Sequence, residues 1–219
     1  MRRLIFMAAI TVMGTILVSC KDDDESDPGL ELLTNNELEQ GVVSPRGWFN
    51  FESPDPDAGN YDLEWTTEEA LSGIRSLKIS STQLMADNFA SWGTNIPFNG
   101  SDNAGNELTL TVWIKGNLDG TGVSIAIRGD QQGVTQSVSF DTTEGRESIT
   151  GEFDWTKFDV TTVVESRVTE YVLFCVYLPQ TTGEVFFDDV SLTIRENEIV
   201  LRAFDHVLVM LDESTHGML

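Results

Sequence analysis

The chain has 219 residues, of which 36 are aspartate or glutamate and 13 are lysine or arginine, so its formal net charge is −23. Such a surface repels phosphate backbones and anionic head groups, which argues against nucleic-acid binding and against direct peripheral binding to a membrane. Apolar residues make up 40% of the chain, with 12 Phe and 5 Trp, which is enough to bury the core of one domain with extensions.

Residues 1–19 have the pattern of a secretory signal peptide. Two arginines follow the first methionine, and the segment 4–18 is apolar apart from two threonines and a glycine. This run of about 15 residues is shorter than the roughly 20 that cross a bilayer as a permanent helix. Its end, residues 17–20 (Leu-Val-Ser-Cys), resembles the lipobox of bacterial lipoproteins, which implies cleavage before Cys20 and a lipid on its thiol. An ordinary secreted protein with a chance cysteine is the alternative.

An acidic run, residues 21–25 (Lys-Asp-Asp-Asp-Glu), follows Cys20 directly. It cannot pack into a core and must be solvated, which predicts a flexible tether over residues 20–29. Next to a lipobox it resembles the export signal of Bacteroidetes-type lipoproteins. That resemblance implies a lipid anchor in the outer membrane with the protein facing the cell exterior. A linker on a lipoprotein that remains in the periplasm is the alternative.

Between residues 30 and 194 the apolar pattern predicts an all-β domain. Leu108, Leu110, Val112 and Ile114 alternate along one strand, 107–115, and Val123, Ile125 and Ile127 along a second. The glycine-rich segment 116–122 between them is predicted to be a turn. Further strands are predicted at 74–80, 134–140, 171–178 and 185–194. No segment has a sustained helical stripe, so the predicted fold is a sandwich of antiparallel sheets.

Cysteine and histidine are nearly absent from this domain. With Cys20 lipidated, Cys175 has no partner for an intrachain disulfide, and both histidines lie in the C-terminal extension 195–219. Ser-His-Asp and Cys-His catalysis and nearly all zinc sites are thereby excluded from the main domain. Apolar positions spaced along 200–211 suit one face of a short helix in the extension.

Five segments each contain one motif of an ordered series. They are 33–41 followed by Gly47-Trp48, the Ser-Leu strand 72–79, the strand 110–116 ending in Lys-Gly, the Trp-x-x-Phe of 155–158, and the final strand 185–192 (Val-Phe-Phe-Asp-Asp-Val-Ser-Leu), here called the exit. Together they resemble carbohydrate-binding modules of the family 4, 9 and 22 type over nearly all of 30–194. The exit is the most specific piece. The chain departs from the family at 37–38, where Glu-Leu replaces a small residue and Phe. The resemblance implies a galactose-binding-like jelly roll and a glycan ligand.

The resemblance also implies a structural calcium ion that joins the first strand to the last. Carried over, Glu39 would be one ligand and Asp188 or Asp189 another, with backbone carbonyls near Ser76. Carboxylate and carbonyl oxygens are the ligands that calcium prefers. Successive residues of a strand point to opposite faces, so one aspartate is expected to bind, and Asp188 is preferred. The alternative is that the pair simply ends a strand in solvent.

Binding a sugar requires exposed aromatic rings flanked by hydrogen-bonding groups. Trp113 and Arg128 point away from the apolar stripes of their strands, so both would lie on a concave sheet if those strands are neighbours. Tyr177 lies on the opposite face of its strand from Phe174, and Trp92 lies on a predicted loop or strand edge. These are the candidate carbohydrate-binding residues: Trp92, Trp113, Arg128 and Tyr177. For each aromatic, packing in the interior is the alternative.

The sequence therefore predicts a non-catalytic glycan-binding lipoprotein at the cell surface, which would capture poly- or oligosaccharide for hydrolases or an importer of a polysaccharide-utilisation system. A glycoside hydrolase is one alternative, but it needs two carboxylates about 5–10 Å apart across a cleft, and no local signature singles out a pair. A structural or adhesion protein, which would bind another protein through the concave face or the C-terminal segment, is the other.

Overall fold

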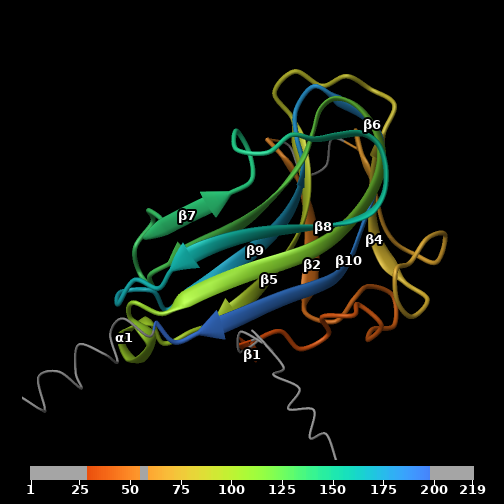
Figure 1. Ribbon diagram of the computed structural model, residues 1–219. Coiled ribbons are helices and arrows are strands. Elements are labelled where there is room, and N and C mark those ends of the chain that lie inside the picture. Colours follow the sequence, from red (N-terminus) through yellow and green to blue (C-terminus); the bar gives the residue numbers. More distant parts are fainter. Residues whose placement is uncertain (1–28, 55–58, 198–219) are drawn as a thin grey trace, which may run out of the picture.

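The computed structural model in Figure 1 describes residues 29–54 and 59–197. Every strand pairing is antiparallel, and helix among the described residues is confined to one turn, α1 (Gly100–Asn103). No described helix has the length and apolar character needed to span a bilayer. The fold is the antiparallel jelly-roll sandwich that the sequence predicts. The predicted signal peptide, Cys20, the acidic run and the predicted C-terminal helix lie outside the described residues.

The strands form two sheets that share one long strand. In the front sheet the order is β2 (Trp48–Ser53), β5 (Phe89–Pro97), β9 (Glu170–Tyr177), the second half of β6 (Glu107–Asp130) and β7 (Ser139–Thr142). In the back sheet the order is β3 (Asp62–Thr66), β4 (Ser76–Ser81), β10 (Thr181–Arg195), the first half of β6 and β8 (Ile149–Val163), with β1 (Leu30–Glu31) beside the end of β10.

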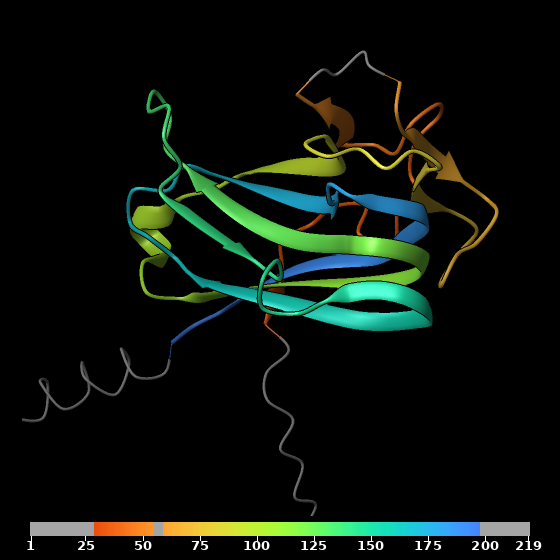
Figure 2. The same cartoon turned by 90° about the horizontal axis from the view of Figure 1, so that it is seen from above.

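β6 is one strand of 24 residues, and its bend is visible at one end of the molecule in Figure 2. Gly120 and Gly122 take positive φ angles of 95° and 93° at this bend. A Cβ at Gly120 would lie 2.0 Å from the carbonyl oxygen of Gln180, and one at Gly122 would lie 2.1 Å from that of Ile149. The predicted turn at 116–122 is therefore wrong, because the glycines let the chain bend while it stays in the ladder.

The core lies between the two sheets. The back sheet contributes the predicted stripe of β6, and the front sheet contributes the second stripe, all at most 1% exposed: Leu108, Leu110, Val112, Ile114, Val123, Ile125 and Ile127. β9, beside the second half of β6 in the front sheet, adds its odd-numbered residues to the same core: Tyr171, Leu173, Cys175 and Tyr177. Burial of this apolar area, at about 25 cal/mol per Å², is the main favourable contribution to folding.

Three of the other predicted strands coincide with observed ones. The segments 74–80, 171–178 and 185–194 correspond to β4, β9 and β10. The strand predicted at 134–140 is largely wrong, because β7 begins only at Ser139 and the preceding residues form a loop that leads out of β6. The sequence pattern does not predict β1, β2, β3, β5 or β8.

Candidate functional site

The outward face of the front sheet carries an apolar hollow of about 460 Å³. Because the odd-numbered residues of β9 and of the second half of β6 face the core, their even-numbered neighbours, such as Phe174 and Ala126, face outward. Phe51 on β2 and Phe89 on β5 stand on one side of the hollow, and Phe140 on β7 stands on the other. We call this site the phenylalanine hollow.

The aromatic rings of the phenylalanine hollow differ in how freely they meet solvent. Phe51 packs edge to face against Phe174 and Phe89, with ring centroids 6.2 and 5.9 Å apart. Phe174 is only 8% exposed, whereas Phe140 is 55% exposed. The hollow therefore has a fixed aromatic wall on one side and an accessible ring on the other. Small hydroxyl residues lie among the lining, namely Ser91, Ser124 and Thr142.

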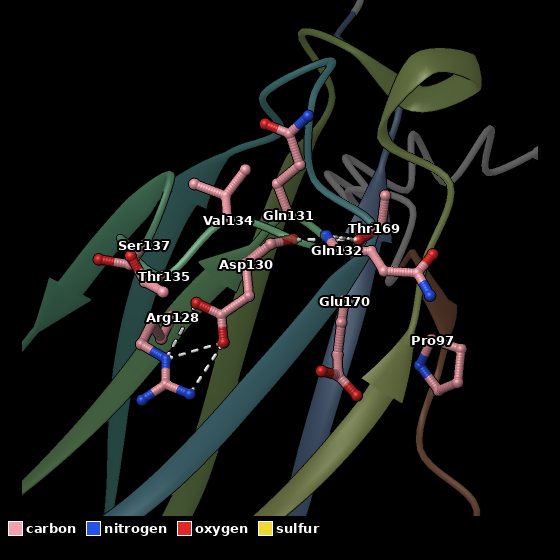
Figure 3. A pocket seen from close by; sticks show the side chains of 10 residues that line it. All are labelled: Pro97, Arg128, Asp130, Gln131, Gln132, Val134, Thr135, Ser137, Thr169 and Glu170. Carbon is pink, nitrogen blue, oxygen red and sulfur yellow. Dashed lines mark hydrogen bonds and ion pairs between the residues drawn. The ribbon is translucent and has the colours of Figure 1, made fainter.

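A second, polar hollow of about 660 Å³ adjoins the first where β6 ends and β9 begins (Figure 3). Asp130 and Glu170 are directly opposite one another in the register of the two strands. The loop that follows β6 adds the amide groups of Gln131 and Gln132 and the hydroxyl groups of Thr135 and Ser137. Thr169 adds a further hydroxyl group. We call this site the polar hollow. It offers both donors and acceptors for hydrogen bonds.

Arg128 lines both hollows and connects them. Its Nε lies 3.1 and 3.0 Å from the two carboxylate oxygens of Asp130, and its Nη2 lies 2.8 Å from Oδ2 (Figure 3). The guanidinium carbon lies 5.2 Å from the ring centre of Phe174. Arg128 thus faces outward, as the alternation of its strand indicates, and its contact with a glycan stays a prediction.

Two of the predicted sugar-binding residues are in the core. Trp92 on β5 is 3% exposed, and its indole N–H donates to the carbonyl of Lys78 at 3.1 Å. Tyr177 on β9 is fully buried, and its hydroxyl donates to the carbonyl of Gly183 at 3.1 Å. A ring enclosed by the core cannot stack on a sugar, so both predictions are wrong. The outward aromatic residue of β9 is Phe174.

Trp113 lies away from both hollows. It is half-buried on the outward face of the back sheet, where its neighbours in register are Lys157 of β8 and Asp188 of β10. The two strands expected at 107–115 and 123–128 are halves of β6 and do not pair with each other, so the condition under which Trp113 and Arg128 would share a concave sheet is not met. A glycan on Trp113 would occupy a separate site.

Sequence reasoning missed the four phenylalanines of the hollow, Phe51, Phe89, Phe140 and Phe174. β2 and β5 were not predicted, so Phe51 and Phe89 had no assigned face. β9 is apolar on both faces, so the alternation of its residues does not tell which face points outward. The signal that identifies the outward face is the pairing of β9 with β6, since Phe174 is opposite the outward-facing Ala126.

The acidic residues expected to bind calcium instead meet the loop between β3 and β4. Glu39 Oε1 accepts hydrogen bonds from the backbone N–H groups of residues 74 and 75, both at 2.8 Å. Asp188 Oδ2 accepts from those of residues 71 and 72, at 2.7 and 3.2 Å. Asp189 Oδ1 accepts from the hydroxyl of Ser72 at 2.6 Å. The three carboxylates therefore hold one loop, residues 67–75, against the sandwich.

The two aspartates reach this loop together because β10 is irregular between Asp188 and Ser191, and Asp189 has a positive φ of 44°. The expectation that they point to opposite faces is wrong. Asp188 is fully buried, and this desolvation raises the pKa of its carboxyl to about 6, although backbone N–H donors act in the opposite direction.

Calcium takes six to eight oxygen ligands. Both oxygens of Asp188, and Oε1 of Glu39, point at backbone N–H groups rather than toward a shared centre. Over residues 29–54 and 59–197 no three acidic, cysteine or histidine side chains are placed to hold a metal together. The arrangement fits a hydrogen-bonded latch for the loop and does not complete a calcium site, so calcium stays a prediction.

No protein-family model matches the sequence, and no curated protein matches it. The fold does match solved structures. The Stig cyclase Fisc from Fischerella sp. TAU has a TM-score of 0.57 at 16% identity, over 77% of this chain and 98% of that one.

Two carbohydrate-binding modules are also similar. For the CBM22-1 xylan-binding domain from Paenibacillus barcinonensis the TM-score is 0.51 at 15% identity, over 77% of this chain and 97% of that one. For TmCBM61, solved with β-1,4-galactotriose, the TM-score is 0.50 at 16% sequence identity, and the match covers 76% of this chain and 100% of that one. At such identities the likeness establishes the fold alone. The chain has the jelly-roll fold that carbohydrate-binding modules share with a cyclase.

Proposed function

We propose that the protein is a non-catalytic glycan-binding protein whose ligand lies along the outward face of the front sheet. The observation that carries the proposal is the junction of two hollows on one sheet face, one lined by phenylalanine rings and the other by hydrogen-bonding groups. Sugar rings have flat C–H patches and a rim of hydroxyls, so a binding site needs both kinds of surface side by side.

The fold supports this proposal by likeness. Among the similar solved structures, one is a xylan-binding domain and another was solved with a galactotriose. The structural match spans nearly the whole of each of these two chains. A likeness of fold does not carry a function with it, and for this reason the proposal depends on the hollows.

The direct test is a glycan array with the mature chain carrying Cys20→Ala, followed by isothermal titration with each oligosaccharide that binds. We expect binding to a defined neutral oligosaccharide and no release of reducing sugar during long incubation. Phe140→Ala should weaken the binding, because this is the most exposed ring of the phenylalanine hollow. Absence of binding to every glycan would contradict the proposal, and release of reducing sugar would favour a hydrolase.

A small apolar molecule is the second candidate ligand. The phenylalanine hollow is apolar over much of its lining, and the similar Stig cyclase was solved with an indole derivative. Titration with an uncharged indole, with and without the bound oligosaccharide, separates the two. If the natural ligand is of this second kind, the indole should bind more tightly than any sugar, and no oligosaccharide should displace it.

We also propose that a lipid on Cys20 holds the protein at the outer membrane, facing the cell exterior, where it would serve hydrolases or an importer. The sequence pattern of residues 1–25 supports this. Cys20→Ala should move the protein from the washed membrane fraction to the soluble fraction. Deletion of residues 21–25 should keep it in the membrane fraction but protect it from protease added to intact cells. Unchanged fractionation or unchanged digestion would contradict the respective part.

A further inference from the structure

Arg128 is the one basic residue among those that line the two hollows in the described part of the chain. The same lining holds three carboxylates, those of Asp130, Glu144 and Glu170. An arginine in a sugar-binding groove would ordinarily suit an anionic sugar, because a guanidinium binds a carboxylate through two parallel hydrogen bonds. The question is whether Arg128 is free to do so.

Arg128 is already paired with a carboxylate of the protein. Its Nε and Nη2 both donate to Asp130, so one of the two edges at which a guanidinium binds a carboxylate is occupied and its positive charge is neutralised (Figure 3). Asp130 lies two residues further along the same face of β6, and its side chain is 26% exposed. Arginine keeps its charge at any accessible pH, so the pair does not open by deprotonation of Arg128.

The Nη1–Nη2 edge of Arg128 remains for a ligand. The hydrogen bonds that its side chain makes to residues within 29–54 and 59–197 are those of Nε and Nη2 to Asp130, so the N–H groups of the other edge can donate to a hydroxyl or a ring oxygen. The carboxylate oxygens of Asp130 and Glu170 can accept hydrogen bonds from sugar hydroxyls. An anionic sugar would instead meet these two carboxylates and a chain with a net charge of −23.

We infer that Asp130 determines the specificity of the groove by neutralising the charge of Arg128 and occupying one edge of its guanidinium, so that the site selects neutral glycans and rejects uronates. This inference rests on the proposed glycan-binding function and names the substrate class of that same site. Asp130→Asn removes the carboxylate that occupies the guanidinium, and Arg128 then becomes a receptor for the carboxylate of a uronate. One substitution should therefore change the class of ligand.

The test uses the mature chain with Cys20→Ala and pairs of oligosaccharides that share a backbone. The neutral members are the β-1,4-linked hexaoses of glucose, mannose and galactose, and each partner is the same sugar oxidised at C6 to the uronate. Xylohexaose is a further neutral probe. Affinities are measured by isothermal titration at low and at high salt, and melting curves confirm that each variant folds.

For the wild type we expect the neutral member of one pair to bind and its uronate to bind at least about tenfold more weakly, with the difference shrinking at high salt. For Asp130→Asn we expect the affinity for the uronate to rise at least about tenfold, the effect of one charge-assisted pair of hydrogen bonds. The double variant Arg128→Gln with Asp130→Asn should lose that gain. Glu144→Gln, which removes a lining carboxylate that does not contact Arg128, should not produce it.

The outcomes separate the two proposals. If the wild type binds none of these sugars or those of the array, glycan binding itself is wrong. If it binds a neutral sugar but Asp130→Asn gains no affinity for the matching uronate, the specificity role is wrong and glycan binding stands. Equal gains from Asp130→Asn and Glu144→Gln would also overturn it, because net charge rather than the release of Arg128 would then be the cause. A wild type that prefers the uronate would overturn it directly.

Discussion

Residues alternate between core and outward face in the same way along both halves of β6, but the outward residues of the two halves belong to different kinds of surface. In the first half Thr111 and Trp113 point outward and lie opposite Asp159 and Lys157 of β8, so the surface is polar. In the second half the outward Ala126 lies opposite Phe174 of β9, and the surface becomes the floor of a hollow. Alternation decides which residues face outward, but the neighbouring strand decides what kind of surface they join.

The largest expected effect tests the boundary between the core and the phenylalanine hollow. Trp92→Ala should lower the free energy of unfolding by about 3–5 kcal/mol, because it empties a ring-sized volume in the core. Urea denaturation measures the loss. The affinity of the protein that remains folded should be unchanged. If Trp92→Ala instead abolished glycan binding without lowering stability, the ring would belong to the binding site after all.

The next effect concerns the pH dependence of the loop latch. Because the folded pKa of Asp188, about 6, lies above the ordinary value of 3.8, the native state binds this proton more tightly than the unfolded state does. Stability from this group is therefore present at low pH and is lost as the pH rises from about 4 through 6, by up to about 3 kcal/mol. We expect the stability of the wild type, relative to Asp188→Asn, to fall over this interval in the presence of a chelator.

Calcium would reverse that trend, because its ligands must be ionised. The same titration with added calcium therefore tests the ion implied by the resemblance. Calcium at a free concentration a hundredfold above its Kd would raise the free energy of unfolding by about 2.7 kcal/mol at neutral pH. Asp188→Asn and Glu39→Ala should each abolish this gain. Asp102→Ala, a carboxylate elsewhere on the surface, serves as the control. Identical melting curves in calcium and in chelator would contradict the calcium prediction and leave the hydrogen bonds as the sole latch.

A smaller effect is expected on glycan affinity when one outward aromatic ring is removed from either sheet. Phe140→Ala should weaken binding by about 1–3 kcal/mol, the range seen when a ring stacks on an aromatic side chain, with little change in melting temperature. Trp113→Ala, the matched change on the back sheet, should leave the affinity unchanged. Isothermal titration of both variants with the same oligosaccharide gives the comparison. Loss of affinity in Trp113→Ala alone would move the binding site to the back sheet.

Alternation within single strands predicted the antiparallel sandwich and most of the buried stripes, and the resemblance to carbohydrate-binding modules predicted the jelly roll. Alternation failed where a strand is apolar on both sides, as in β9, since it then permits either Tyr177 or Phe174 to face the core. It failed also at Asp189, where a positive φ breaks the alternation. The phenylalanine hollow joins residues 51, 89, 140 and 174, and only the long-range pairing of strands brings such distant positions together.

The smallest expected effects distinguish two aspartates that pair with a basic residue on the surface, Asp159 beside the first half of β6 and Asp130 at the end of its second half. Asp159 on β8 accepts from the hydroxyl of Thr111 at 2.6 Å and lies 3.4 Å from Lys157, and its side chain is 43% exposed. Exposed pairs of this kind contribute at most about 1 kcal/mol, so Asp159→Asn should change the free energy of unfolding by about 0.5 kcal/mol or less.

Asp130 pairs with Arg128 where the two side chains are 26% and 39% exposed, so Asp130→Asn should change the free energy of unfolding by at most about 1 kcal/mol. The difference between the two variants should appear only with a ligand present. Asp159→Asn should leave every oligosaccharide affinity as it is in the wild type, whereas Asp130→Asn should change them. Thermal melts with and without oligosaccharide measure both effects in one experiment. A large loss of stability in Asp130→Asn would make its ion pair a structural element, and a change of affinity in Asp159→Asn would place ligand contacts on the polar face of the back sheet.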